Sequence, residues 1–459
     1  MKTVLMFVAA SLAFGQARLP QYSRDVLPNG SQLFLLPRAG VPLVHFRILI
    51  RGGVESDPAS KAGLSNVTAA LLRRGTAKRS AAQFAEELDY LGGTFNAGFF
   101  GEYAGATAIS AEFLSKDFDA GLELLSDAVL HPAFTDSEVR KEVARRVDQA
   151  KSIRDNPQGA IASYFRATFF GQGHPYGTPP DEASYAKIAR EDIAGYHARL
   201  FCGKNMLIVV TGDFDATAAK GKLTTVFGAA PAGEAYAWAK APALARRGQM
   251  LLINKPDATQ TYFQIAQPGI DIKNPDRTTL EIVNTLFGGR FTSMLNDELR
   301  VNSGLTYGAG CRLDQNRLPG AISISTYTKT DTTAQALDLA LDVLKRLNEK
   351  GISEAQLASA KAYVKGVYPT QRLETMDQLA NLIGEIELFG LGRDEVDGFF
   401  GRIDAVTVER ANAAIKKYYR TDDLTFVILG AADKIRDKVK KYDPNLREVS
   451  INSAGWGER

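Results

Sequence analysis

The alternation of apolar and polar residues is clearest between positions 43 and 51. Valine, phenylalanine and isoleucine fill the even positions from 44 to 50, whereas a histidine, two arginines and a leucine fill the odd positions from 45 to 51. A period of two is typical of a half-buried β-strand. Further strands are predicted at 33–37, 94–100, 103–110 and 206–210. A helix is predicted at 58–74, where Pro58 suits the first turn and Gly75 ends it, followed by a helix at 80–91 and a helical stretch over 114–200.

The second half of the chain repeats this order of elements. It predicts strands at 250–254, 259–266, 307–313, 321–328 and 424–429, a helix at 276–287 closed by Gly288-Gly289, a short helix ending near Arg300, and helices through 350 and over 353–419. An ordered series of this length indicates an internal duplication.

The duplication predicts the domain organisation. We expect homologous domains at 18–230 and 249–445, a linker rich in alanine, proline and glycine at 231–248, and a C-terminal tail at 446–459. Each domain is expected to be α+β, with helices packed on one face of a mainly antiparallel sheet.

The N-terminal residues 1–17 have the three parts of a signal peptide. Lys2 is basic, residues 4–14 are almost all apolar, and Gly15-Gln16-Ala17 offers small residues for cleavage. The apolar run is too short to span a bilayer, and no later segment approaches the roughly 20 apolar residues that a spanning helix needs. The pattern predicts a soluble protein exported across the inner membrane to the periplasm.

Charge and cysteine content narrow the possible partners. A net charge of +3 over 459 residues argues against nucleic-acid and membrane-surface partners. Cys202 and Cys311 lie far apart and have no metal-binding spacing. A single disulfide between them is possible in an oxidising compartment, and the sequence leaves that pairing open.

The first predicted long helix carries a recognisable but altered motif. Ala62-Gly63 precedes it and Gly75-Thr76 follows it, and Asn66, Ala69 and Ala70 share one helix face at spacings of three and four. This stretch resembles the H-x-x-E-H region of the pitrilysin/insulinase-type zinc peptidases, the inverzincins, in which two histidines bind zinc and the glutamate is the general base. Here none of the three positions keeps its zinc-site residue.

Other landmarks extend the resemblance over nearly the whole mature chain. They are the edge-strand sequence at 92–97, Arg154-Asp155-Asn156-Pro157, His174-Pro175-Tyr176-Gly177 and the closing strand at 205–213. In the family, a glutamate before the Asp-Asn-Pro sequence is the third zinc ligand, and Gln149 stands in that place. The four histidines show no pairing at i+3 or i+4, so we predict that this chain binds no metal.

The second half retains a family motif of another kind. The stretches Gly289 to Leu295, Glu298 to Arg300 and Ser303 to Tyr307 resemble the part of the C-terminal domain whose arginine and tyrosine hydrogen-bond the substrate, and these two match Arg300 and Tyr307. Such donors stabilise the negative charge that develops on an attacked carbonyl oxygen. Taken singly, Arg300 also fits a solvated helix end and Tyr307 an ordinary strand aromatic.

The combination suggests a division of labour between two chains. Some members of this family split the zinc motif and the Arg/Tyr pair between two subunits, and this sequence has only the second set. The resemblance implies the non-zinc subunit of a heterodimeric metallopeptidase that cleaves unfolded peptides, with zinc held by a homologous partner. The alternative is a non-catalytic structural or peptide-binding pseudopeptidase. A self-sufficient peptidase is disfavoured, because the chain has no G-x-S-x-G elbow and no cysteine-protease context.

Overall fold

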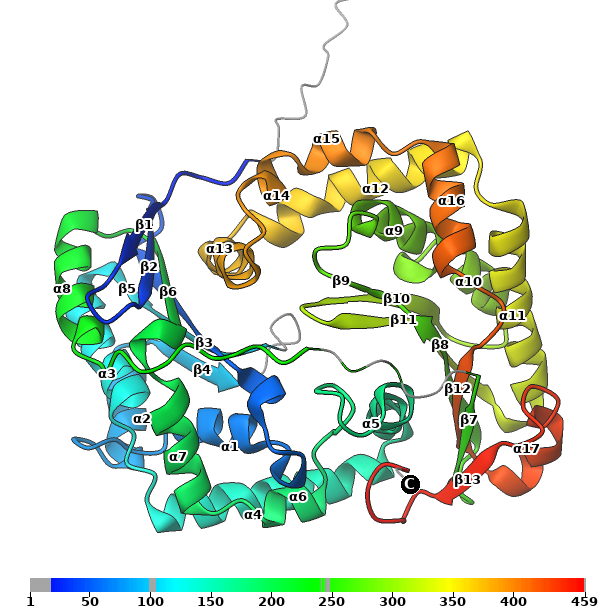
Figure 1. Ribbon diagram of the computed structural model, residues 1–459, viewed down its shortest axis with the longest axis horizontal. Helices are drawn as coiled ribbons and strands as arrows, with labels where there is room; N and C mark the ends of the chain where they lie inside the picture. Colours follow the sequence, from blue (N-terminus) through cyan, green and yellow to red (C-terminus); the bar gives the residue numbers. More distant parts are fainter. Residues whose placement is uncertain (1–17, 99–104, 241, 243, 245–247, 458–459) are drawn as a thin grey trace, which may run out of the picture.

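The computed structural model describes residues 18–98, 105–240, 242, 244 and 248–457. The predicted signal peptide at 1–17 lies outside the described residues, as does the segment where the predicted strands 94–100 and 103–110 adjoin. Two β-sheets stand on opposite sides of the molecule, and helices lie along the outer side of each sheet and connect the two sides (Figure 1).

The first half contains a six-stranded sheet in the order β1-β2-β6-β3-β5-β4. Its strands are β1 (Ser23–Val26), β2 (Gln32–Pro37), β3 (Leu43–Arg51), β4 (Thr94–Gly98), β5 (Ala106–Leu114) and β6 (Met206–Gly212). Its helices are α1 (Leu64–Leu71), α2 (Ala81–Tyr90), α3 (Phe118–Leu130), α4 (Asp136–Ser152), α5 (Pro157–Phe170), α6 (Glu182–Ala186), α7 (Arg190–Leu200) and α8 (Ala216–Gly228).

The second half contains a seven-stranded sheet in the order β13-β7-β12-β8-β11-β10-β9. Its strands are β7 (Met250–Asn254), β8 (Gln260–Pro268), β9 (Ile270–Asp271), β10 (Ala309–Asn316), β11 (Pro319–Lys329), β12 (Thr425–Gly430) and β13 (Arg447–Ser450). Its helices are α9 (Arg277–Asn284), α10 (Met294–Asn296), α11 (Thr333–Lys350), α12 (Glu354–Arg372), α13 (Met376–Phe389), α14 (Asp394–Asp397), α15 (Phe399–Asp404), α16 (Val408–Tyr418) and α17 (Ala432–Val439).

The strand order confirms the internal duplication. The series β2-β6-β3-β5-β4 in the first sheet corresponds to β7-β12-β8-β11-β10 in the second. In each series the first pairing is parallel and the other three are antiparallel. The α+β class is therefore confirmed, and the short strands β9 and β13 add parallel pairings at the two edges of the second sheet.

Local sequence fixes where several helices begin. The side chains of Ser80, Ser353 and Thr375 each accept the backbone N–H of the residue three positions on. That residue is a glutamine, and its side-chain oxygen accepts the backbone N–H of the capping residue. These capping boxes satisfy amide groups that a helix start leaves without partners. Helix α5 begins at Asn156-Pro157, where the asparagine caps and the proline occupies the first turn.

Helix α1 is shorter than the predicted helix at 58–74. Gly63 adopts a left-handed conformation with φ of 94°, which breaks the helical path before residue 64. The Asp57 carboxylate accepts the N–H groups of Gly63 and Ser65 at 3.0 and 2.8 Å and anchors the new start. The residues before Gly63 form only a short 3₁₀ turn at Ala59–Lys61.

Each sheet is covered by its own helices on one face and by a helix from the other half on its second face. Helix α13 packs on β3 and β6 of the first sheet, and α5 packs on β8 and β12 of the second (Figure 1). Leu379, Ile383 and Ile386 of α13 share a buried cluster with strand residues of the first sheet. The two helices occupy corresponding places in the duplicated order, so the exchange is reciprocal.

This exchange corrects the prediction for β3. The strand was expected to be half-buried, but both of its faces are covered, and His45, one of its odd positions, is 5% exposed. Its Nε2 lies 2.9 Å from Asp377 Oδ1 on α13, and Arg47 reaches the same carboxylate at 2.6 Å. The alternation of residues was read correctly, but the polar face meets another helix instead of solvent.

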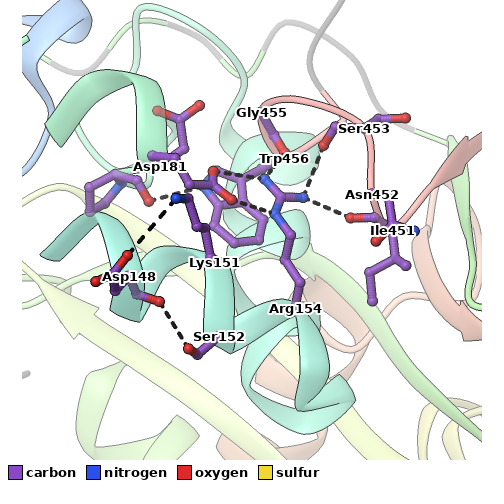
Figure 2. Close-up of polar contacts among 12 residues, drawn as sticks. Asp148, Lys151, Ser152, Arg154, Asp181, Ile451, Asn452, Ser453, Gly455 and Trp456 are labelled. Carbon is purple, nitrogen blue, oxygen red and sulfur yellow. Dashed lines mark hydrogen bonds and ion pairs between the residues drawn. The ribbon is translucent and has the colours of Figure 1, made fainter. Parts of the chain in front are cut away.

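The C-terminal residues are tied into both halves of the molecule. Strand β13 pairs with β7, and the segment after it turns back toward α5. Figure 2 shows the Arg154 side chain pointing into this turn, where its guanidinium donates to the carbonyl oxygens of Ile451, Ser453 and Gly455 at 2.8–3.0 Å. Trp456 lies against the guanidinium, with its ring centre 4.5 Å away.

Candidate functional site

The residues that the resemblance matched to the zinc-ligand positions lie on neighbouring helices. Asn66, Ala69 and Ala70 are on α1, Gln149 is on α4, and these two helices pack together. Asn66 and Ala70 are partly buried, Ala69 is fully buried, and Gln149 is exposed. Alanine has no ligating atom, and neither amide is the imidazole or carboxylate that zinc prefers, so these residues do not fit a zinc ion.

The rest of the described chain offers no substitute metal site. No group of three or more histidine, cysteine, aspartate or glutamate side chains that could hold a metal ion occurs among the residues that the structure describes. Glu142, the buried carboxylate of α4, accepts hydrogen bonds from Arg145 and Arg146 at 2.9 and 2.8 Å. Cys202 and Cys311 are both buried and free, so the bridge that the sequence left open is not formed.

Arg300 and Tyr307 lie in a region of unusual backbone. π-Helices occupy Thr285–Gly289 and Asp297–Asn302, instead of the predicted closure of the helix at Gly288-Gly289. Gly288 permits this path, because a Cβ there would lie 2.3 Å from the backbone nitrogen of Cys311 on β10. Short π-helical turns are frequent at functional sites.

Asn296 holds this region together. Its Nδ2 donates to the Phe291 carbonyl at 2.7 Å, and its Oδ1 accepts the Ala309 N–H at 3.2 Å. The Phe291 ring in turn supports Arg300, whose guanidinium carbon is 4.6 Å from the ring centre. The loop, the π-helix and the start of β10 are thereby fixed relative to one another.

The polar groups of Arg300 and Tyr307 form no side-chain hydrogen bonds with the described residues. Tyr307 is 80% exposed, and Arg300 is partly exposed. Among the residues that the structure describes, neither the guanidinium nor the phenol has a hydrogen-bond or carboxylate partner, and the guanidinium lies against the Phe291 ring. Both side chains are therefore available to an external ligand.

Arg300 lines a cleft of about 560 Å³ on the face of the second sheet that α5 also covers. Tyr262 and Tyr327 form part of it, and their rings stack with centres 5.3 Å apart because the two residues are direct partners across β8 and β11. Gln158 and Ile161 of α5 complete it from the first half. This volume is within the range of small-ligand and side-chain binding sites.

A second, more polar cavity lies between the two halves and was not predicted. It measures about 790 Å³ and includes Arg47, Asn96 and Arg312 from the strands and Asp377 from α13. The contact with His45, together with Arg47, holds the pKa of Asp377 below its usual range. These residues come together only because α13 crosses to the other half, which no local sequence pattern signals.

Known protein families match most of the chain. The family model described as Insulinase (Peptidase family M16) matches residues 35–177, and the model described as the Peptidase M16 inactive domain matches residues 187–364. Together they span more than two thirds of the chain. The chain belongs to the peptidase M16 family.

Relatives within the M16 family carry two kinds of name. An uncharacterised zinc protease of Mycobacterium tuberculosis is 27% identical over 86% of this chain and 90% of its own length. A non-peptidase homologue of Helicobacter pylori is 24% identical over 87% of this chain and 91% of its own length.

A solved structure shares the M16 fold over most of its length. It is the peptidase M16 inactive domain from Pseudomonas fluorescens, with a TM-score of 0.82 and 23% identity over 89% of this chain and 98% of that one. The matches to an inactive domain and to a non-peptidase homologue support an inactive member of the family. None of the helices in the described part of the chain is both long and apolar enough to cross a bilayer.

Proposed function

We propose that this M16 chain is the non-zinc subunit of a heterodimeric metallopeptidase that cleaves unfolded peptides. The observation that carries the proposal is the pair Arg300 and Tyr307, whose donors are exposed and have no partners among the described residues. Asn66, Ala69 and Ala70 supply no imidazole or carboxylate, so peptide hydrolysis beside these donors requires a metal that another subunit brings. The homologous partner would hold the zinc.

The chemistry of the pair suits a supporting role in peptide hydrolysis. When a peptide carbonyl is attacked, negative charge accumulates on its oxygen, and donors already fixed in place stabilise it without reorganisation. Arg300 is permanently charged and offers several N–H groups, and Tyr307 offers one O–H. The packing around Asn296 supplies the rigidity that such preorganisation needs.

The compartment is part of the same proposal. The predicted signal peptide at 1–17 supports export to the periplasm, where unfolded peptides would be the substrate. A net charge of +3 supports a peptide and a protein partner, rather than nucleic acid or a membrane.

The decisive experiment measures turnover by the reconstituted pair. The chain is combined with a homologue from the same source that carries an H-x-x-E-H motif, and cleavage of a quenched fluorescent peptide is followed. Tyr307→Phe should lower kcat by about 10² to 10³, which is typical for the loss of one oxyanion donor. Arg300→Ala should cost at least as much, and Arg300→Lys should rescue poorly because an ammonium lacks the planar fork.

The controls separate catalysis from assembly. Tyr90, 89% exposed on α2, provides a matched tyrosine outside the site, and Tyr90→Phe should keep full activity. Gel filtration should show the same complex for every variant. If the Arg300 and Tyr307 variants keep near-normal turnover, the chain acts as a structural or peptide-binding pseudopeptidase, and the catalytic proposal is wrong.

A further inference from the structure

The cleft beside Arg300 contains a second arginine that the proposed function does not use. Arg290 follows the π-helix at Thr285–Gly289 and lines the same cavity. Its Nε donates to the Thr292 carbonyl at 3.3 Å, and its Nη1 donates to the Ser359 hydroxyl on α12 at 3.1 Å. These bonds hold the guanidinium in place and leave Nη2 available.

The walls of this cleft carry positive charge and no negative charge among the described residues. Arg290 and Arg300 both line it, and no aspartate or glutamate is among the described residues that form its walls. Among the residues that the structure describes, neither the Arg290 nor the Arg300 guanidinium is paired with a carboxylate. Two like charges beside one cavity repel each other, and a bound anion relieves that repulsion.

The other walls favour an extended peptide over a small inorganic ion. The stacked rings of Tyr262 and Tyr327 supply a flat, partly apolar surface, and the phenol of Tyr327 has no hydrogen-bond partner among the described residues. Gln158 of α5 adds a polar amide at the rim. Guanidinium groups recognise carboxylates well because their paired N–H groups match the two oxygens.

We propose that this cleft is a specificity subsite that takes a carboxylate of the bound peptide, and that Arg290 is the residue that selects it. The proposal rests on the proposed function, since the peptide is the one that Arg300 and Tyr307 contact. The carboxylate belongs either to a glutamate or aspartate side chain or to the C-terminus of the peptide. Arg290 is a binding residue that leaves the chemistry to the other two side chains.

Direct binding to the purified chain tests the subsite without any turnover. The probes are four fluorescein-labelled nonapeptides of alanine, serine and glycine, with a central glutamate or glutamine and with a free or amidated C-terminus. Fluorescence anisotropy should show about tenfold tighter binding when the preferred carboxylate is present, a ratio expected for one charge-assisted contact near the surface. The pair of probes that differs by tenfold identifies which carboxylate is bound.

Variants assign the selectivity to Arg290. Arg290→Gln should remove the tenfold ratio while the neutral probe binds as before, and Arg290→Lys should keep part of the ratio because it keeps a positive charge. Ser359→Ala should weaken the ratio by loosening the guanidinium. Arg38, exposed in the first half, provides the matched control, and Arg38→Gln should leave the ratio unchanged.

The outcomes separate this inference from the proposed function. Equal binding of all four probes, or a ratio that survives Arg290→Gln in a folded chain, overturns the subsite. If the ratio depends on Arg290 but the Arg300 and Tyr307 variants retain turnover, the subsite stands and the catalytic proposal fails. Circular dichroism of each variant confirms folding, and Arg290→Lys provides the second measurement if Arg290→Gln does not fold.

Discussion

Replacing Arg154 with alanine tests how the C-terminal segment is held. The side chain is 10% exposed, donates to three backbone carbonyls between residues 451 and 455, and pairs with Glu182 at 2.9 and 3.1 Å. Removing one partner of a largely buried ion pair costs about 3–5 kcal/mol, because the remaining carboxylate and the backbone carbonyls then lack a hydrogen-bond donor. Glu182 is 25% exposed, so water recovers part of this loss and we expect about 3 kcal/mol.

The assay combines stability with local protection. Arg154→Ala should lower the urea midpoint and expose the segment after β13 to carboxypeptidase, and Arg154→Lys should recover little, since an ammonium cannot reach several carbonyls at once. In a chain ending at Ser450, the same substitution should cost much less, because three of its acceptors are gone and the loss of Trp456 exposes the pair with Glu182 to water. An equal cost in both backgrounds would refute the view that Arg154 acts through the C-terminal segment.

Three further predictions concern metal, processing and pH. The chain purified alone should contain no stoichiometric zinc by elemental analysis, because Asn66, Ala69 and Ala70 supply no imidazole or carboxylate, and about one tightly held zinc per chain would contradict this. N-terminal sequencing of native protein should begin near Arg18, and an intact Met1 would refute export by cleavage at Ala17. Burial, and secondarily Arg166, lowers the pKa of His174 to about 4, and its Nδ1 accepts the Tyr176 N–H at 3.0 Å, so the folded state requires the neutral ring. The unfolded chain therefore binds more protons than the folded protein between pH 6.5 and 4. The free energy of unfolding should fall by up to about 3 kcal/mol as the pH decreases over that interval. Urea titrations should show a flatter pH profile for His174→Gln.

Much of the fold was predictable because local patterns determine the strands and the helix starts. The repeated order of elements indicated the duplication, and the matching strand orders of the two sheets confirm it. Helix lengths were less predictable. The apolar pattern continued through residues 58–74, whereas Gly63 and Asp57 set the start of α1 through backbone geometry and hydrogen bonds.

Some residues of the candidate site were also predictable from local motifs, whereas others depend on contacts between the two halves. The residues at the zinc-motif positions and the Arg300 and Tyr307 pair were identified from local motifs, and the structure adds that Tyr307 is exposed and Arg300 partly exposed. His45, Asp377 and the cavity between the halves were not predictable, because they depend on a helix that crosses from one half to the other. Arg290 lies in the Gly289 to Leu295 stretch, but the resemblance gave it no role, and its place beside Arg300 becomes evident only from the shared cleft.

The reciprocal placement of α5 and α13 bears on how such a chain could originate. A single ancestral copy would have had one sheet face bare and one helix without a sheet to cover. Two identical copies related by a two-fold axis would have repaired both defects at once, since such an axis makes the same patch serve both partners. Fusion of two such genes would convert this association into an intramolecular one that dilution cannot reverse.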